Sequence, residues 1–436
     1  MTLCIGVREE NKNEWERRAP LTPRTVSLLR EDGIEVAVQS SKRRVFPDRD
    51  YEEAGATLQP DVSACPIVLG IKEVPASRFR SGGVYMFFSH TIKGQPHNMA
   101  MLRRMVELGC TLLDYELVVD ARGRRLIFFG RYAGLAGMID TLWLLGRRLA
   151  HFGWTTPLLG LEPAHRYADL ASAKAAVSAA GARIAEEGLP AEFAPWVVGF
   201  SGYGHVSQGA QEIFDLLPHR QVAPSDLAAF VAGNRAHTRE LAKVVYKEEH
   251  IVEPAVPGHR FELQDYYDHP EQYRSAFGPH LGLLTVLVNG IFWSEKYPRL
   301  ATRDQLRELF SRPERPRLLA VGDITCDVNG SVACTVRETH SGDPVYIYDP
   351  NTGEARSGVE GEGLAVLAVG NLPCELPRES SETFSDVLRP FIPALARMDL
   401  EGPLEKAGLP EELSRSVILW RGEFSPGCQH LREFVR

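Results

Sequence analysis

The segment from Trp196 to Phe214, WVVGFSGYGHVSQGAQEIF, constrains the fold more than any other part of this 436-residue chain. An apolar run leads into a glycine-broken turn and then directly into a helical pattern. Gly202 permits a tight turn, and Gly204 lets a ligand approach the backbone without meeting a Cβ. This order of strand, turn and helix is typical of a site for the pyrophosphate of a dinucleotide, because the first amides of the helix face the anion. Ser207 stands where the third glycine of the pattern is usual.

Length and composition indicate a globular protein of two domains. A chain of 436 residues exceeds the usual size of one hydrophobic core, and 44% hydrophobic with 24% charged residues is ordinary for such a protein. The net charge of -8 gives no indication of a nucleic-acid partner. The seven cysteines include no C-x-x-C pair, which argues against a disulfide framework or a zinc site. Because neither a secretory signal nor a bilayer-spanning run is visible, we expect a cytoplasmic protein without a membrane partner.

The first 130 residues alternate between strand and helix patterns, which predicts a parallel sheet covered on both faces. Two helices are expected, at 25–32 and 99–108. Strands are expected at 3–8, 35–39, 67–71, 84–88 and 111–113.

The middle of the chain predicts the dinucleotide fold, and the end predicts helices. Helices are expected at 132–152, 164–187, 226–232 and 235–243, an irregular stretch at 259–277, and strands near 318–325 and 363–369. From about Glu382 the chain is predicted to be helical and too short for a core of its own, so it should pack on the first domain. We therefore predict a discontinuous catalytic domain at 1–131 plus 375–436, and a dinucleotide-binding domain at 132–374.

Two predicted strands of the first domain end in ionisable residues. Lys72 and Glu73 follow the apolar run in IVLGIKEVP, and His90 follows the run in YMFFSHTIKG. Ligands of open α/β sheets bind beyond the carboxyl ends of the strands. Each residue alone is more often a solvated loop side chain. Together, and in a chain with a nucleotide motif, they indicate an acid/base pair.

Three further residues could bind a charged substrate. Arg18 follows the first strand and could pair with a carboxylate, whereas Arg17 could equally form a surface salt bridge. Glu116 follows the strand in LLDYE, and Arg125 lies shortly after it. No histidines have metal-ligand spacing, so no metal site is predicted.

The chain resembles the lysine–2-oxoglutarate reductase domain of the aminoadipic semialdehyde synthases, within the wider alanine dehydrogenase and saccharopine dehydrogenase group. The resemblance extends from the first strand nearly to the end. It rests on segments that include WERRAPLTP, LGIKEVP, FFSHTIKGQ, LLDYE, FGRYAGLAGMID, SGYGHVSQGAQEIF, HPEQYRS, LVNGIFW with YPRL, and NLPCELPRE. The second enzyme of the bifunctional proteins has no room here, so we expect a stand-alone reductase.

The resemblance implies two Rossmann-like domains with parallel sheets and an active site in the cleft between them. It implies that the ε-amine of L-lysine condenses with 2-oxoglutarate and that the imine is reduced to saccharopine. Lys72 and His90 match the acid/base groups of the family. The substrate-contacting positions correspond to Arg18, Glu73, Glu116, Arg125 and Asp327. Cofactor-binding positions are Gly202, Tyr203, Gly204, His205, Val206, Ser207, Arg220, Asn371 and Leu372.

Cofactor choice is argued from the strand that follows the glycine turn. A site for NAD usually has an acid at the end of that strand, where it binds the ribose hydroxyls. Here the stretch is LPHRQVAPSDL, with Val222 and Ala223 where an acid is expected, and Asp226 fits the start of a helix. NADPH is therefore favoured over NADH, with Arg220 as the candidate for the 2′-phosphate.

Two alternatives remain open at this stage. The enzyme could couple another amine or amino acid with another 2-oxoacid, or the chain could be a catalytically silent nucleotide-binding protein. The presence of both Lys72 and His90 argues against the silent protein. The oligomeric state is left open, a homo-oligomer included.

Overall fold

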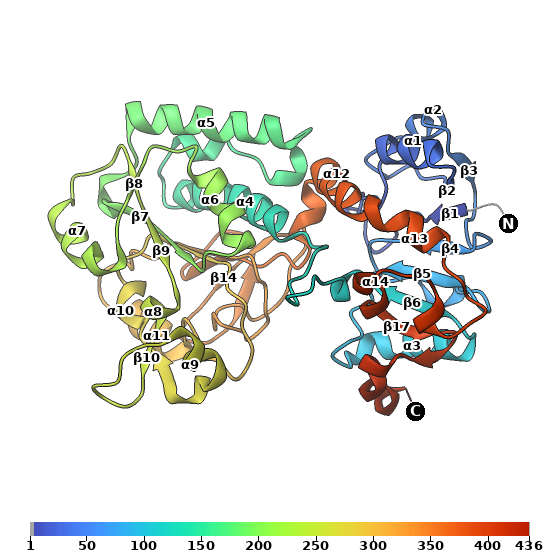
Figure 1. Ribbon diagram of the computed structural model, residues 1–436. Helices are drawn as coiled ribbons and strands as arrows, with labels where there is room; N and C mark the ends of the chain where they lie inside the picture. The colour runs from blue at the N-terminus through green and yellow to red at the C-terminus, as the bar shows by residue number, and fades with distance from the viewer. Residues whose placement is uncertain (1–3, 436) are drawn as a thin grey trace. The chain divides into compact units, whose positions relative to one another are not determined.

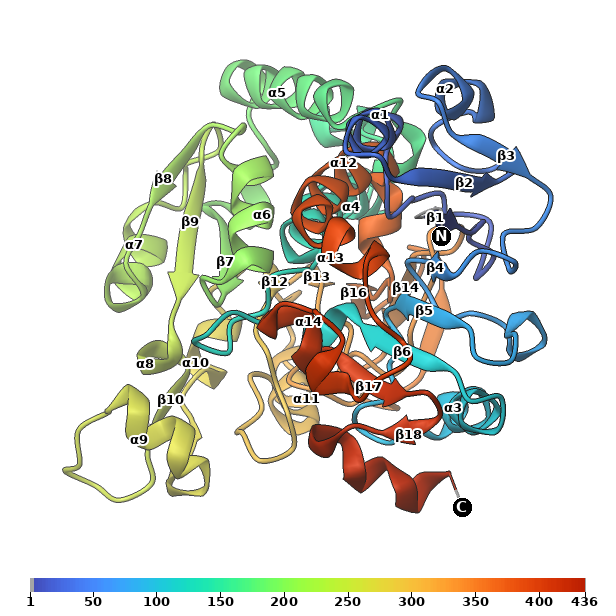
Figure 2. The same cartoon turned by 45° about the vertical axis from the view of Figure 1, so that its right-hand side comes forward.

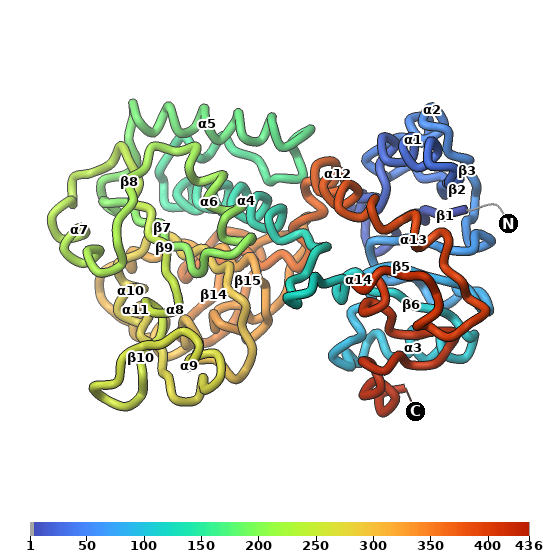
Figure 3. The backbone as a smooth tube through the Cα atoms, in the orientation of Figure 1, coloured from blue at the N-terminus to red at the C-terminus, as the bar shows by residue number. Residues whose placement is uncertain are grey.

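The computed structural model describes residues 4–435 and divides into two compact units. Unit 1 contains the described residues up to Phe129 and those from Pro377 onward, and unit 2 contains Gly130–Leu376. The blue beginning and the red end of the chain therefore lie in the same unit (Figure 1). The backbone passes from one unit to the other before α4 and again before α12 (Figure 3).

Each unit is built on an eight-stranded, mostly parallel sheet, which confirms the predicted α/β class. In unit 1 the order is β18-β17-β6-β5-β4-β1-β2-β3, and only β17 and β18 run antiparallel to their neighbours. The strands are β1 Cys4–Val7, β2 Glu35–Gln39, β3 Thr57–Gln59, β4 Ile67–Leu69, β5 Val84–Phe87, β6 Thr111–Asp114, β17 Val417–Trp420 and β18 Glu423–Phe424.

The helices of unit 1 come from both ends of the chain. Thr22 caps the first of them by accepting a hydrogen bond from the amide of Thr25, and proline occupies its first turn, as helix starts favour. The helices are α1 Pro23–Glu31, α2 Asp48–Glu53, α3 Pro96–Glu107, α12 Pro377–Leu388, α13 Ile392–Ala396 and α14 Glu411–Arg415.

The prediction that the end of the chain is only helical is wrong. Val417–Trp420 forms β17, which pairs with β6 and extends the sheet of unit 1. Its first three residues are fully buried, and a short apolar run of β-branched residues satisfies its backbone by joining an existing sheet edge.

Unit 2 repeats the arrangement around the glycine motif. Its strand order is β15-β14-β16-β13-β12-β7-β9-β8, with β14 and β15 antiparallel. The strands are β7 Trp196–Ser201, β8 His219–Gln221, β9 Leu241–Tyr246, β12 Val286–Asn289, β13 Ala320–Asp323, β14 Val345–Tyr348, β15 Ala355–Ser357 and β16 Leu364–Leu367. A separate hairpin pairs β10 Val252–Pro254 with β11 Tyr273–Ser275.

The helices of unit 2 include the longest in the structure. α4 Gly130–His151 is buried along most of its length, as its nearly continuous apolar character predicts. α5 starts at Leu170 instead of the expected 164, because Asp169 and Ser172 form a capping box there. The others are α6 His205–Phe214, α7 Leu227–Gly233, α8 Glu248–Ile251, α9 Leu263–Asp268, α10 Gly278–Leu281 and α11 Arg303–Phe310.

The helix predicted at 235–243 is wrong, and the error matters for the site. The segment continues into β9, a strand of β-branched and apolar residues that lies between β8 and β7 (Figure 2). The charged residues before Leu241 favour a helix in the sequence pattern. The residues from Leu241 onward form a strand because they are buried in the sheet. The stretch 259–277 is likewise not wholly irregular, since it contains α9 and β11.

Candidate functional site

Four adjacent parallel strands of unit 1 end at one edge of the sheet, and the predicted acid/base residues follow two of them. β1, β4, β5 and β6 are neighbours, with β1 between β2 and β4. Lys72 and Glu73 follow β4, and His90 follows β5. The sheet thus has its change of winding direction beside β4, where ligands of such folds bind.

Glu73 and His90 form a close hydrogen-bonded pair. His90 Nδ1 lies 2.7 Å from Glu73 Oε1, and the other carboxylate oxygen lies 3.1 Å from the Nζ of Lys12. Burial works to raise the pKa of Glu73, but the hydrogen bond with His90 and the charge of Lys12 outweigh it and lower this pKa. Glu73 is therefore a carboxylate that fixes the imidazole in place.

Lys72 occupies an environment that disfavours its charge. Burial and the nearby cation Arg18 lower the pKa of Lys72. Its backbone is held by the buried Glu10, which accepts hydrogen bonds from the amides of Ile71 at 2.7 Å and Lys72 at 3.0 Å. Among residues 4–435 the Nζ of Lys72 has no hydrogen-bond or ion-pair partner. Such a lysine can exchange a proton with a substrate.

The backbone at His90 is in an uncommon conformation. Its φ is +48°, and the side-chain amide of Asn98 donates to the carbonyls of Ser89 at 3.0 Å and His90 at 3.2 Å. Asp114 accepts from the amide of Ser89 at 2.9 Å and from that of Glu116 at 2.7 Å. One buried carboxylate thus holds both the His90 loop and the Glu116 turn. Burial raises the pKa of Asp114 to about 6.

The predicted substrate-binding residues of unit 1 form two ion pairs. Arg18 is 2% exposed, donates through two nitrogens to Glu16 at 2.7 and 2.6 Å, and lies over the ring of Phe129 at 4.2 Å. Arg125 is exposed and donates to Glu116 at 2.5 Å. Arg18 therefore lies beside Lys72 as a fixed cation, and Arg125 can exchange its partner for a substrate carboxylate.

The glycine turn of unit 2 has the properties that a pyrophosphate requires. Gly202 has a φ of +83°, which favours glycine, and its amide donates to the carbonyl of Tyr246 at 2.8 Å. Apart from its chain neighbours, no described heavy atom lies within 4 Å of a Cβ built on Gly204, and no described side chain caps α6. His205 and Val206 begin that helix. The residues present therefore fit a phosphate group at this helix N-terminus.

Two glycines let α4 and α6 pack closely. A Cβ on Gly134 would lie 2.0 Å from the carbonyl oxygen of Val206, and one on Gly209 would lie 2.1 Å from that of Arg131. Ser207, at the place of the third glycine, is buried. The close approach of α4 to α6 is at Gly209 instead. Gly209, two residues later, provides the close approach of the helix that the third glycine of the motif usually provides.

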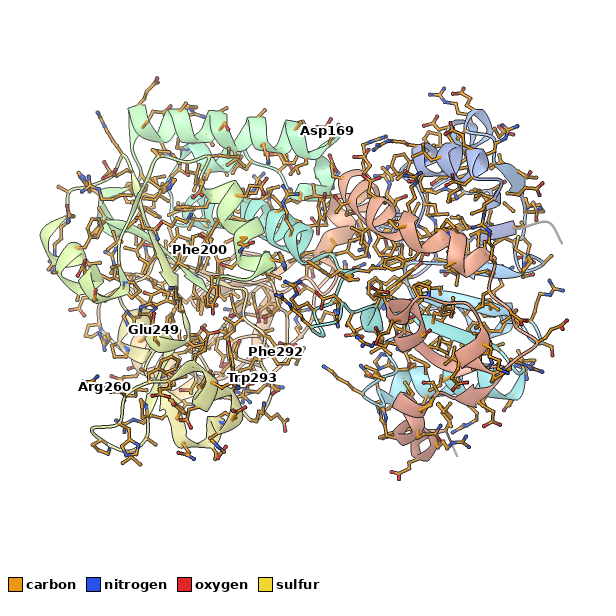
Figure 4. The ribbon with its side chains drawn as sticks, viewed as in Figure 1. Asp169, Phe200, Glu249, Arg260, Phe292 and Trp293 are labelled. Atoms are coloured by element: carbon orange, nitrogen blue, oxygen red, sulfur yellow. The ribbon has the colours of Figure 1, made fainter. Side chains whose placement is uncertain are left out.

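An aromatic pocket of about 400 Å³ lies beside the glycine turn, within unit 2. Glu248 lines it and accepts a hydrogen bond from the hydroxyl of Tyr267 at 2.8 Å. Phe292 and Trp293, which follow β12, are labelled in Figure 4. The aromatic lining comprises Tyr203, Tyr246, Tyr266, Tyr267, Phe292, Trp293 and Tyr297. A flat heterocycle such as adenine fits a pocket of this character.

The strand beside the glycine strand is β9, not β8. Arg220 lies on the edge strand β8, and its guanidinium is paired with Glu240 at 2.7 Å. The residues that follow β9 are Lys247, which is exposed, and Glu248. The structure therefore does not bring Arg220 to the strand that borders the glycine turn.

The remaining predicted residues lie at other strand ends of unit 2. Asp327 is exposed in a turn after β13, and two residues of this turn, Cys326 and Asn329, have φ of +54°. Asn371 is partly buried, whereas Leu372 packs in the core of the unit. All three thus follow parallel strands of the same sheet.

Sequence reasoning missed Lys12, Glu10, Asp114 and Glu248. Glu10 follows β1, and Asp114 ends β6. An acid at the carboxyl end of a parallel strand is a sequence signal that could have indicated a role at the site. Lys12 lies in a loop and Glu248 begins the short helix α8, and only their contacts with Glu73 and Tyr267 distinguish them.

Comparison with known proteins gives two kinds of relative. Alpha-aminoadipic semialdehyde synthase of Arabidopsis thaliana is 38% identical over 97% of this chain, and the mitochondrial protein of Bos taurus is 34% identical over 98%. The chain is similar to alpha-aminoadipic semialdehyde synthase over nearly all of its own length. The resemblance seen in the motifs is thereby confirmed. The chain spans 40% of the length of the plant synthase and 47% of that of the bovine one.

Other matches cover whole proteins or shorter segments. Residues 6–136 match the model of the alanine dehydrogenase/PNT N-terminal domain. Saccharopine dehydrogenase [NAD(+), L-lysine-forming] of Neurospora crassa is 28% identical over 89% of this chain and 90% of its own length. Among solved structures, L-alanine dehydrogenase superposes with a TM-score of 0.62 at 16% identity, covering 99% of this chain and all of the other. This last similarity establishes the fold.

The described residues contain neither a metal-binding cluster nor a membrane-spanning helix. No group of three or more His, Cys, Asp or Glu side chains within 4–435 could hold a metal ion. In the same part of the chain, no helix is long and apolar enough to cross a membrane.

Proposed function

We propose that this chain is an NAD(P)H-dependent reductase that condenses the ε-amine of L-lysine with 2-oxoglutarate and reduces the imine to saccharopine, reversibly. Unit 1 binds the substrates and moves protons, and unit 2 binds the nucleotide. The names of the relatives support the substrate, since the Neurospora protein is named L-lysine-forming and NAD(+)-dependent.

The observation that carries the proposal is the group of Lys72, Glu73 and His90 at one sheet edge. Condensation requires a neutral amine, and dehydration requires a proton at the departing oxygen. Lys72, whose pKa is lowered by burial and by Arg18, takes the proton from the substrate ammonium at its Nζ. His90, held by Glu73 at 2.7 Å, delivers a proton as water leaves.

The charged residues around this group suit the substrates. 2-Oxoglutarate has two carboxylates, and Arg18 and Arg125 are cations that can pair with them. L-Lysine has an ammonium beside its α-carboxylate, for which Glu116 and Asp327 are the proposed partners. Glu73 orients the imidazole of His90 and faces the amine.

The nucleotide is assigned to the glycine turn and the pocket beside it. Gly202, Tyr203, Gly204, His205, Val206 and Ser207 would hold its pyrophosphate, and Asn371 and Leu372 would border the nicotinamide ribose. When bound, it supplies the hydride. The aromatic pocket would receive the adenine, where it is shielded from water.

We propose NADPH as the reductant, with the 2′-phosphate bound by a cation near the glycine turn. Lys247 is the candidate beside the turn, and Arg220, on the edge strand β8, is the alternative that the sequence suggested. Lys247 follows the strand that borders the turn and has no ion-pair partner within the described residues, whereas Arg220 is paired with Glu240. Glu248, which lines the aromatic pocket, is an acid that would instead favour the unphosphorylated ribose hydroxyls of NADH. Lys247→Ala and Arg220→Ala should therefore be compared for KM with both nucleotides. A rise for NADPH alone marks the phosphate ligand, and a stronger wild-type activity with NADH overturns the choice.

The decisive assay follows the loss of NADPH with 2-oxoglutarate and a panel of amines. Turnover with L-lysine, and a product with the mass of saccharopine, is the expected result. Turnover with another amine only would replace lysine in the proposal, and no turnover with any amine would leave a nucleotide-binding protein. The proposed setting is the cytoplasm, which cell fractionation tests.

A further inference from the structure

Two cysteines that the proposed reaction does not use lie together in unit 1. Cys4 is the first residue of β1, and Cys65 lies two residues before β4. Their sulfurs are 3.9 Å apart. They are at the amino ends of the strands, opposite the edge from which Lys72 and Glu73 extend.

The sheet register explains the contact. β1 and β4 are parallel neighbours, with Ile5 opposite Ile67, so residue 4 lies beside the segment that contains residue 65. Residues placed in this way on adjacent strands have Cα separations within the range that a disulfide spans. A Cβ on Gly6 would come within 2.9 Å of the Cβ of Cys65, so the glycine leaves room for this cysteine. Both cysteines are only partly buried and can be reached by a small reagent.

The two thiols differ in acidity. The hydrogen bond between them lowers the pKa of Cys4 to about 7, although burial and the carboxylate of Glu35 act in the opposite direction. The same hydrogen bond, together with burial and Asp61, raises the pKa of Cys65, and Arg80 opposes this only in part. At neutral pH a large share of Cys4 is therefore thiolate, whereas Cys65 keeps its proton.

The other cysteines of the chain lack these features. Cys110, Cys334, Cys374 and Cys428 are buried, and burial raises the pKa of Cys110 to about 11. Cys326 is partly buried, but its thiol donates to the carbonyl of Ala368 at 2.8 Å, and burial raises its pKa. Within the described residues, Cys110, Cys326, Cys334 and Cys428 make no sulfur–sulfur contact with another cysteine.

We propose that Cys4 and Cys65 form a reversible intramolecular disulfide by exchange with a low-molecular-weight disulfide. The Cys4 thiolate attacks one sulfur of the reagent, forms a mixed disulfide and releases the other half as a thiolate. Cys65 then loses its proton and attacks the Cys4 sulfur, and the second half leaves as a thiolate. Two cysteine thiols are oxidised, and one disulfide reagent is reduced to two thiols. The proposal is independent of the reaction that the enzyme catalyses.

Oxidised glutathione, added to the full folded chain, tests the proposal. Peptide mapping by mass spectrometry should find a Cys4–Cys65 cross-link that dithiothreitol reverses. In Cys65→Ser the glutathione should stay attached to Cys4. In Cys4→Ser the remaining Cys65 should react at least tenfold more slowly at neutral pH, because burial and Asp61 still raise its pKa and a protonated thiol is a poor nucleophile. Cys326→Ser is the matched control and should cross-link as the wild type does.

The pH dependence separates this mechanism from adventitious oxidation. The cross-linking rate should rise to half its maximum near pH 7, following the Cys4 thiolate. The oxidised chain should also unfold at a higher temperature than the reduced chain, because the bond closes a loop of about 60 residues in the unfolded state. Separate adducts on both cysteines, a cross-link to another cysteine, or no reaction at either thiol would each overturn the proposal.

Discussion

At the carboxyl edge of the sheet in unit 1 titratable side chains form a close group, whereas the same edge in unit 2 is built around a glycine turn and backbone amides. Lys72, Glu73 and His90 follow strands of unit 1 and are titratable. The glycine turn of unit 2 has open space above Gly204 and an uncapped helix behind it. Both sheets have eight mostly parallel strands, and the difference in chemistry lies in the loops that follow these strands.

Below these loops the two units are more alike. In unit 1 the buried Glu10 and Asp114 accept backbone amides of the loops that contain Lys72 and His90. In unit 2 the buried Asp323 accepts from the side chain of Asn289 at 2.8 Å and from the amide of Cys326 at 3.2 Å. A buried carboxylate thus holds the loops in both units, and burial raises the pKa of Asp323 as it does that of Asp114.

The largest expected effect is at the charged edge. Lys72→Met and His90→Asn should each lower kcat by at least about 100-fold, because each removes a proton-transfer group. The KM for the nucleotide should change by less than about threefold, since the glycine turn is in unit 2. Steady-state kinetics with a circular dichroism check of folding measure both. A large rise in nucleotide KM with unchanged kcat would contradict the proposal that unit 1 transfers protons and unit 2 binds the nucleotide.

The next effect concerns the glycines of unit 2. Gly209→Ala should lower the free energy of unfolding by about 1–3 kcal/mol, because the added methyl would meet the carbonyl of Arg131. Gly204→Ala is the matched control and should leave stability within about 0.5 kcal/mol, because open space lies above this residue. The control should instead raise the Kd for the nucleotide by roughly tenfold, measured by calorimetry, since the methyl obstructs the phosphate. Equal stability losses in both variants would contradict this.

The stability of an Asp114 variant should depend on pH, because Asp114 is the buried carboxylate that holds the His90 loop. Its pKa of about 6 lies above the value of about 3.9 in an unfolded chain, so the folded protein binds the extra proton between these values. The penalty of the buried charge is absent below about pH 4 and complete above about pH 6. Asp114→Asn cannot acquire this charge. The stability of the variant relative to the wild type should therefore improve by about 2–3 kcal/mol from pH 4 to pH 7, in urea unfolding. A difference independent of pH would contradict the raised pKa.

The smallest effect is at Lys12, which lies at the rim of the charged edge. Its cation helps to lower the pKa of Lys72, after burial and Arg18. Lys12→Met should therefore raise that pKa and move the rising limb of the kcat profile to higher pH, because the neutral amine is the active form. Arg17→Met, which removes an exposed cation hydrogen-bonded to the carbonyl of Arg43, should leave the limb unchanged. If the limb moves equally in both variants, the shift comes from the loss of any positive charge and not from the position of Lys12 beside Lys72.

Much of the charged edge could be predicted from the sequence. Apolar runs that end in Lys72 and His90 are visible, and the carboxyl ends of neighbouring parallel strands share an edge. The contact between Glu73 and Lys12 could not be predicted, because 61 residues separate them and only the loop conformation brings them together.

The nucleotide side was harder because strand order is not contained in local patterns. The charged residues before β9 favour a helix at 235–243, and the sequence does not show that β9 lies between β8 and the glycine strand β7. The structure has β9 in that position, which brings Lys247 and Glu248 to the turn in place of Arg220. Pairing between distant segments decides such an order, and a single sequence does not show it.

The central claim is that the charged edge of unit 1 acts on a substrate reduced by the nucleotide of unit 2. A crystal structure of the protein with NADP+ and saccharopine tests it most directly. The account predicts that the secondary amine of saccharopine lies between C4 of the nicotinamide and the side chains of Lys72 and His90. A nucleotide on the glycine turn with both side chains directed to solvent, away from the nicotinamide, would contradict it.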